Sequence, residues 1–370
     1  MKNLRVLVAW CCMLLPLLAG CDLTGDLKDV EMVRALSVDI IDNVDILDSA
    51  DKVEAQENSS MISAAVHLLH RDRALEGQYA ESYYQLTAEG DSLAAALGQL
   101  YDAGAKQLNF SHTSLLVLGE QAAPTKFWLD YALRSPQLRP TVYPLVCVGQ
   151  TEALLAADEQ TLSPIYLLNN LAEPMGSSYP GVFGVSLQDF VEDFYQTGIA
   201  PALPLVEKTA DGVAAAGLAV YAGDKIALLT DDDAVLAWQL LVRTPYLYGM
   251  VLALDDGVAV RLQGGQIFIR LQPVDRAEDL RPVCELELQA DILNNPAGLD
   301  TQQVRALLNE RLQQILAVGM AKSRRLQADF LGIGREIWRK QPHIWPQIAE
   351  QDYLSGITVD LQTEIELNAD

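Results

Sequence analysis

The most restrictive pattern in the sequence is a strict alternation of apolar and polar residues in two segments near its C-terminus. Every second residue of 284–292 is apolar, and the odd positions of 357–367 are apolar or threonine. Successive side chains of a strand point to opposite faces of a sheet, so both segments predict strands with one buried face. Between them, Asp300 or Thr301 is placed to cap a long helix. This part of the chain therefore predicts a sheet covered by a helix.

The predicted helix precedes two glycines that are expected to end it. Its apolar positions at helical spacing are Val304, Leu308, Leu312, Ile315 and Gly319. Because glycine favours the left-handed conformation that often closes a helix, we expect a stop near Gly332 and Gly334, with Gly334 at a positive φ angle. A further helical stretch is expected over 336–339. The glycine pair lacks a preceding strand and a third glycine, which argues against a dinucleotide-binding loop.

Strand and helix signals alternate along the first two hundred residues. A helical turn beginning at 31 is expected to run into a strand that ends near Asp39, followed by a polar hairpin excursion over 43–58. A helix is expected to begin at Asp91 or Ser92. The other expected strands are 59–70, 111–119 and 140–149, and the other expected helices are 124–133 and 151–158.

The first twenty residues have the pattern of an export signal. Lys2 and Arg5 precede an apolar run over 6–18, which is too short to cross a bilayer because a span takes roughly 20 apolar residues. The sequence Leu18-Ala19-Gly20-Cys21 resembles the bacterial lipobox, so we expect Cys21 to carry lipid. The alternative is an ordinary secretory signal with an incidental cysteine.

These patterns predict an α+β (mixed α/β) fold in which mixed sheets are covered by helices. Half of the residues are apolar, enough to bury more than one core. Pro201 and Pro204 mark a boundary, and 215–234 has the signature of a hairpin that leads into a turn-rich, strand-like stretch. The expected segments are a signal peptide (1–20), a tether (21–29) and three domains (30–200, 201–275 and 276–370).

The charge balance excludes nucleic acid as a partner. The chain has 26 Lys and Arg against 50 Asp and Glu, a net charge of −24. Binding to DNA or RNA depends on a basic surface that neutralises phosphates. An acidic chain is also repelled by anionic headgroups, so lipid on Cys21 would have to hold the protein at a membrane.

No catalytic or metal-binding motif stands out, so the sequence predicts neither an enzyme nor a cofactor. The patterns HExxH, GxxxxGK[ST] and GxSxG are absent. His67 and His70 lack acidic neighbours to complete a metal site, and the acidic run 231–233 favours a solvated turn over a cation site. Cys147 and Cys284 are expected to be free and buried, with a disulfide between them as the alternative.

One stretch near the C-terminus reverses the acidic character of the chain. Its basic residues are Lys322, Arg324, Arg325, Arg335, Arg339 and Lys340. Within the same twenty residues only Asp329 and Glu336 oppose them. Such a patch suits contact with an acidic partner or with lipid headgroups. A solvated helix face is the alternative.

Several segments together resemble the C-subunit family of bacterial spore germinant receptors, the Ger(x)C lipoproteins. The similarity includes the lipobox and, most specifically, 326–345, which is similar to the family's Ala-Asp-x-x-Gly-x-Gly and Pro-x-x-Trp motifs. The chain departs from the family at Asp22-Leu23, where an aromatic residue is usual, and in its ending, which lacks the family's usual basic, glycine-containing tail after the last strand. The motif positions, expected to be mainly structural, are Asp39, Ser111, His112, Pro201, Gly217, Asp329, Gly332, Gly334 and Trp345.

The resemblance implies a three-domain mixed α/β fold and a non-enzymatic role. It implies a lipid-anchored protein on the outer face of the cytoplasmic membrane, which in spores is the inner spore membrane. There it would work beside integral membrane A and B subunits, and nutrient germinants would act on the complex. The alternative function is a solute-binding lipoprotein of a transporter, although the unequal segments do not indicate its usual two similar lobes.

Overall fold

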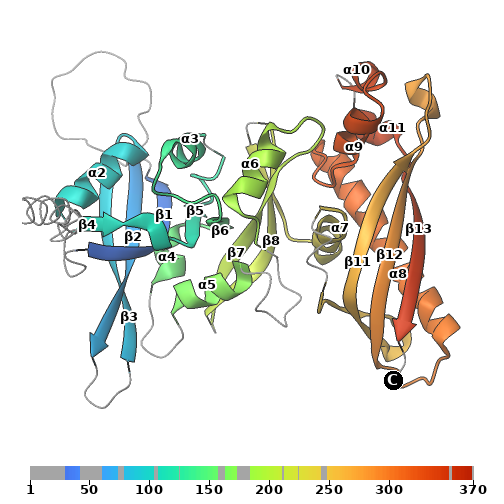
Figure 1. Cartoon of the computed structure of the whole chain (residues 1–370), viewed down its shortest axis with the longest axis horizontal. Helices are drawn as coiled ribbons and strands as arrows, with labels where there is room; N and C mark the ends of the chain where they lie inside the picture. Colours follow the sequence, from blue (N-terminus) through green and yellow to red (C-terminus); the bar gives the residue numbers. More distant parts are fainter. Residues whose placement is uncertain are drawn as a thin grey trace, which may run out of the picture.

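The fold contains two β-sheets with helices packed around them (Figure 1). This computed structural model describes residues 30–41, 61–73, 79–103, 107–124, 126–156, 163–172, 184–210, 212–223, 225–242, 248–349 and 352–368. The predicted mixed α+β fold class, with mixed sheets covered by helices, is confirmed. The predicted signal peptide, tether and hairpin excursion lie outside the described residues.

The first sheet has a parallel centre and antiparallel flanks. Its order is β3-β2-β1-β5-β6-β7-β8-β9, with β4 paired beside β1. β1, β5, β6 and β7 run parallel, and the flanking strands pair antiparallel. The strands are β1 (Val30–Ile41), β2 (Met61–Arg73), β3 (Tyr79–Gly90), β4 (Gln107–Asn109), β5 (Leu115–Gly119), β6 (Tyr143–Cys147), β7 (Ala202–Thr209), β8 (Gly212–Ala222) and β9 (Lys225–Leu229).

Helices cover both faces of this sheet. α4 (Thr151–Leu155) and α5 (Pro164–Ala172) pack on one face, where Leu154 and Leu168 share a buried cluster with Leu115. α2 (Leu93–Ala103), α3 (Phe127–Arg134) and α6 (Leu187–Tyr195) contribute to the buried cluster on the other face. Because both faces are covered, the central strands are continuous apolar runs rather than alternating ones.

The second sheet is backed by the long helix α8 (Thr301–Leu326). Its strands, in order, are β10 (Val251–Ala253), β11 (Ala259–Leu271), β12 (Pro282–Asn294) and β13 (Asp360–Asn368). β13 is parallel to β12 because the chain crosses over through α8. The alternation predicted for 284–292 is confirmed, since its apolar side chains are buried or half-buried while its polar ones face outward. The predicted helical stripe of α8 is buried throughout.

The helix α7 (Asp232–Val242) connects the two cores, in a stretch where the sequence predicts turns and strands. That prediction was wrong because α7 is buried on nearly every side, so its apolar residues show no helical period. α7 packs along α8, and one apolar cluster runs from the first sheet through both helices to the second sheet. Asp232 and Asp233 lie in the first turn of α7, where the helix dipole favours negative charge.

Two predicted helix boundaries differ from the structure. The residues expected to form a helical turn before Asp39 belong to β1, which is extended from Val30. α8 ends at Leu326 because Gln327, rather than a glycine, adopts the left-handed conformation at φ +51°. The helix expected over 336–339 is present as α9 (Ile333–Lys340), and the short helices α10 (Trp345–Ile348) and α11 (Tyr353–Gly356) follow it.

The predicted middle domain, 201–275, does not form a sheet of its own. Its strands β7, β8 and β9 extend the first sheet, whereas β10 and β11 belong to the second. The division of the chain into three folding domains stays a prediction. Across the described ranges, no helix is both long and apolar enough to span a membrane.

Both cysteines of the described chain are free and buried, which confirms the expectation for Cys147 and Cys284. They lie in different sheets, in β6 and β12 respectively. Burial raises the pKa of each thiol to about 12, so neither is a reactive thiolate near neutral pH.

We predict that His67 makes folding sensitive to mild acid. It is buried beside Ser37, whose Oγ lies 3.1 Å from His67 Nε2, and burial lowers its pKa to about 4. The unfolded chain therefore takes up a proton at higher pH than the folded one. Stability that is complete above about pH 6.5 should be lost as the pH falls towards 4, by about 3 kcal/mol.

Urea unfolding of the wild type and His67→Gln at pH 7 and pH 4.5 measures this effect. The wild type should lose more stability between the two pH values than the variant, whose amide does not titrate. Equal losses would show that His67 does not contribute to the acid sensitivity.

Candidate functional site

The most family-specific segment, 326–345, forms a junction between the two halves of the fold. One half is the first sheet with its helices, and the other is the second sheet with α8 and the short helices after it. After α8, the chain turns through Asp329, whose side chain is 5% exposed. Its carboxylate accepts hydrogen bonds from Ile333 N at 3.2 Å, Gly334 N at 2.5 Å and Tyr353 Oη at 2.7 Å. Asp329 thus caps the N-terminus of α9 and joins it to α11.

Burial and the hydrogen bonds donated to Asp329 shift the pKa of its carboxyl group in opposite directions. Burial raises the pKa of Asp329, while the donors at Gly334, Tyr353, Ile333 and Gly332 oppose the rise. Burial and the neighbouring Asp329 charge raise the pKa of Tyr353, so its hydroxyl stays protonated and donates. The Asp329 carboxylate is therefore bound by donors of the same chain, and the Tyr353 hydroxyl is one of them.

Two glycines allow the halves to touch through their backbones. A Cβ added at Gly198 would lie 2.4 Å from the Gly334 carbonyl carbon, and Gly198 has φ +80°. Nearby, Ala200 N donates to the Asp329 backbone oxygen at 2.8 Å. The loop between α6 and β7 thus lies directly on the start of α9.

Gly334 is required for space and not for a left-handed backbone. The expectation of a positive φ angle at Gly334 was wrong, because the residue lies inside α9, and Gly332 is the one at φ +74°. A Cβ at Gly334 would come within 2.2 Å of Tyr353 Oη and 2.9 Å of the Gly198 oxygen. Each glycine of the motif therefore has its own role.

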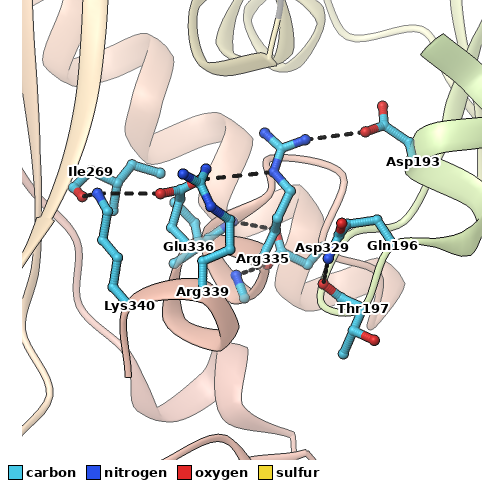
Figure 2. Close-up of polar contacts among 11 residues, drawn as sticks. Asp193, Gln196, Thr197, Ile269, Asp329, Arg335, Glu336, Arg339 and Lys340 are labelled. Atoms are coloured by element: carbon cyan, nitrogen blue, oxygen red, sulfur yellow. Dashed lines mark hydrogen bonds and ion pairs between the residues drawn. The ribbon is translucent and has the colours of Figure 1, made fainter. Parts of the chain in front are cut away.

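Arg335 reinforces the junction from the side. Figure 2 shows its guanidinium reaching from α9 towards α6, where it donates to Asp193 Oδ1 at 3.1 Å. The Arg335 side chain is 25% exposed. This ion pair links the two halves of the molecule, and the partly buried position makes it less screened than a surface pair.

Four of the other five basic residues of the segment also have partners within the chain. Lys322 pairs with Asp231 at 3.0 Å, and Arg324 donates to the backbone oxygens of 354 and 357. Arg339 and Lys340 both pair with Glu336, and Lys340 also donates to the Ile269 oxygen on β11 (Figure 2). Five of the six cations therefore make contacts within the chain, spread over several elements.

Arg325 is exposed, and Arg339 is 58% exposed. A partner or lipid contact for the basic segment stays a prediction.

A second motif carboxylate closes the carboxyl ends of the parallel strands. Asp39, at the end of β1, accepts hydrogen bonds from Thr151 N at 3.1 Å and from Thr151 Oγ1 at 2.5 Å. A Cβ on Gly119 would lie 2.0 Å from Asp39 Oδ1. Burial raises the pKa of Asp39, and the hydrogen bonds from Thr151 oppose the rise. The Asp39 carboxylate is thus used within the chain to hold the start of α4 beside the ends of β1 and β5.

The remaining motif residues occupy separate places in the fold. Ser111 and His112 lie in a 3₁₀ turn before β5, where Ser111 N donates to Asn109 Oδ1 at 2.8 Å and His112 is exposed. The Pro201 oxygen accepts from Tyr221 N at 2.9 Å. Only the segment around Asp329 brings several motif positions together.

Gly217 and Trp345 show why their residue types suit their positions. Gly217 has φ +137° beside a bulge in β8, and a Cβ there would lie 2.1 Å from the Leu229 oxygen. Trp345 stacks edge-on against Tyr353, with ring centroids 5.7 Å apart. Trp345 thus packs behind the hydroxyl that closes the Asp329 turn.

The acidic run at the start of α7 is neither a solvated turn nor a cation site. Arg311 on α8 donates to Asp233 Oδ2 at 2.7 Å, while Asp231 pairs with Lys322. Within the described residues, no group of three His, Cys, Asp or Glu side chains is arranged to hold a metal ion.

The comparisons with known proteins cover both halves of the chain. Residues 25–208 match the family described as Spore germination protein N-terminal domain. Residues 255–370 match the family described as Spore germination B3/GerAC like, C-terminal. The chain therefore belongs to the Ger(x)C family of spore germinant receptor C subunits.

Individual relatives agree with this assignment. Spore germination protein KC of Bacillus subtilis (strain 168) is 25% identical over 317 residues, 75% of this chain and 76% of that protein. Putative spore germination protein YfkR of the same strain is 23% identical over 279 residues, 68% of this chain and 69% of that protein. The crystal structure of the GerBC protein matches with a TM-score of 0.54 at 11% identity, covering 85% of this chain and 95% of that one, which shows a shared fold.

Gly334→Ala should destabilise the protein by about 2–3 kcal/mol, because the added methyl group overlaps Tyr353 Oη. Gly356→Ala is the matched control, since nothing lies within 4 Å of a Cβ there. Combining Gly334→Ala with Tyr353→Phe removes the overlapping oxygen, so the double variant should lose less than the sum of the single losses. Urea unfolding of the wild type and of four variants, with Tyr353→Phe alone among them, measures these losses.

Proposed function

We propose that this protein is the C subunit of a nutrient germinant receptor and acts with integral membrane A and B subunits to trigger spore germination. The observation that carries the proposal is that both halves of the chain match Ger(x)C family descriptions. In this role the subunit binds partners and catalyses no reaction. The family is not a known enzyme class.

The geometry supports a binding subunit. The motif carboxylates Asp39 and Asp329 are consumed by hydrogen bonds that hold the fold together. The junction around Asp329 joins the two halves of the fold through direct backbone contact. Such a body can present surfaces from both sheets to partners in a fixed arrangement.

Lipid on Cys21 would hold the protein on the outer face of the cytoplasmic membrane, and in spores on the inner spore membrane. The lipobox-like sequence before Cys21 supports this location. Each buried CH₂ group of an acyl chain contributes about 0.8 kcal/mol, so two chains hold a protein stably where one does not. A net charge of −24 opposes direct binding to anionic lipid.

In cells that lack the A and B subunits, Cys21→Ala should abolish membrane retention of the processed protein, because the lipid is the direct attachment to the bilayer that the proposal gives it. Fractionation of spore lysates, with metabolic labelling by a palmitate analogue, measures both lipid and location. Cys147→Ala is the matched control, because that cysteine is buried and should neither carry label nor affect retention. Equal retention of processed Cys21→Ala would contradict lipid anchoring.

The receptor assignment predicts that the tagged protein co-purifies with multi-span A and B subunits from detergent-solubilised spore membranes. Deleting the gene should remove the response to a nutrient while leaving germination by a non-nutrient trigger intact. Recovery of transporter permeases in place of A and B subunits would contradict the assignment. That outcome would favour the solute-binding alternative.

A further inference from the structure

The last strand of the second sheet presents an open edge. β13 pairs in parallel with β12 from Asp360 to Asn368 and, among the described parts of the chain, no strand lies on its other side. In Figure 1 it forms the outer margin of the sheet, with α8 behind it. An edge strand of nine residues offers a row of backbone donors and acceptors to another chain.

A groove runs beside this edge. It has a volume of about 590 Å³ and lies between α8 and the first half of β13. Its lining includes Leu316, Ala317 and Met320 from α8 and Leu361 from β13, with Gln313, Gln362 and Arg324 at its margins. Arg324 is held by the backbone oxygens of 354 and 357. A strand added to β13 would therefore place every second side chain over the part of α8 where Ala317 is exposed between the buried side chains of Leu316 and Met320.

The opposite face of the same edge is acidic. Gln362, Glu364 and Glu366 are exposed on β13, and the register places Glu364 directly opposite Glu287 on β12. Like charges that face each other across a ladder are unfavourable. Within the described chain no salt bridge joins Glu287 or Glu364 to a cation, so a cation brought by a partner would relieve the repulsion.

We propose that the open edge of β13 binds an extended segment of a partner protein in which basic and apolar residues alternate. The backbone of the segment adds a strand to the sheet, its apolar side chains enter the groove on α8, and its Lys or Arg side chains lie over Glu364 and Glu366. A second copy of this chain fits poorly, because two β13 edges would place acidic residues against acidic residues. The proposal does not require the partner to be a receptor subunit.

The test uses the purified full chain in detergent micelles and three labelled nine-residue peptides. One alternates Lys and Val, one alternates Glu and Val, and one has the Lys and Val residues in separate blocks. By fluorescence anisotropy, the alternating Lys peptide should bind about tenfold more tightly than either control. Hydrogen exchange of the β13 amides should slow only with that peptide.

Variants separate strand addition from general charge attraction. Ala317→Arg adds a long cationic side chain to the exposed floor of the groove, which already has Arg324 at its margin, and should weaken binding of the alternating Lys peptide about tenfold. Ala306→Arg is the matched control, because Ala306 is exposed on the same helix but does not line the groove, and its binding should equal the wild type. Glu364→Gln with Glu366→Gln should weaken the Lys peptide and leave the Glu peptide unchanged or tighter.

Equal binding of the alternating and block peptides would overturn the proposal. So would equal effects of Ala317→Arg and Ala306→Arg, or exchange that slows elsewhere but not in β13. The acidic residues would then serve only to keep the sheet edge from aggregating.

Discussion

The buried carboxylate of Asp329 is the interaction on which the arrangement of the two halves depends. A charged group at 5% exposure is costly unless donors compensate it. Its donors include the first two N–H groups of α9, which need an acceptor, and the hydroxyl of Tyr353. The Asp329 backbone oxygen meanwhile accepts from Ala200 in the other half. One residue therefore ends the turn, starts α9 and links the halves.

With the turn fixed by Asp329, the two halves contact each other directly through their backbones. Gly198 and Gly334 meet so closely that neither position has room for a Cβ. Backbones that touch in this way can slide or rotate little without overlap, because interiors are close-packed. The ion pair from Arg335 to Asp193 adds to the same junction. The basic residue that the sequence indicates as a surface contact is thus a structural link.

The sequence predicts the elements that have one solvent-exposed face and one buried face. β12, β13 and α8 follow period 2 or 3.6 because each is buried on one side. α7 is buried nearly all round and gives no period. The left-handed Gln327 gives no signal either. Family resemblance identifies Asp329 and Gly334, but their partners Gly198, Ala200 and Tyr353 lie elsewhere in the chain and meet them only in the folded structure.

The use of cations inside the fold determines what the surface can bind. Lys322, Arg311 and Arg335 pair with aspartates on neighbouring segments, and so hold α7 and α6 against α8 and α9. Each of these pairs is neutral, so the net charge of −24 remains on the other residues, among which acidic side chains outnumber basic ones in a larger proportion. The sheet of β11, β12 and β13 shows the result, with facing glutamates on adjacent strands. Long-range attraction therefore favours basic partners over anionic lipid at this end of the molecule.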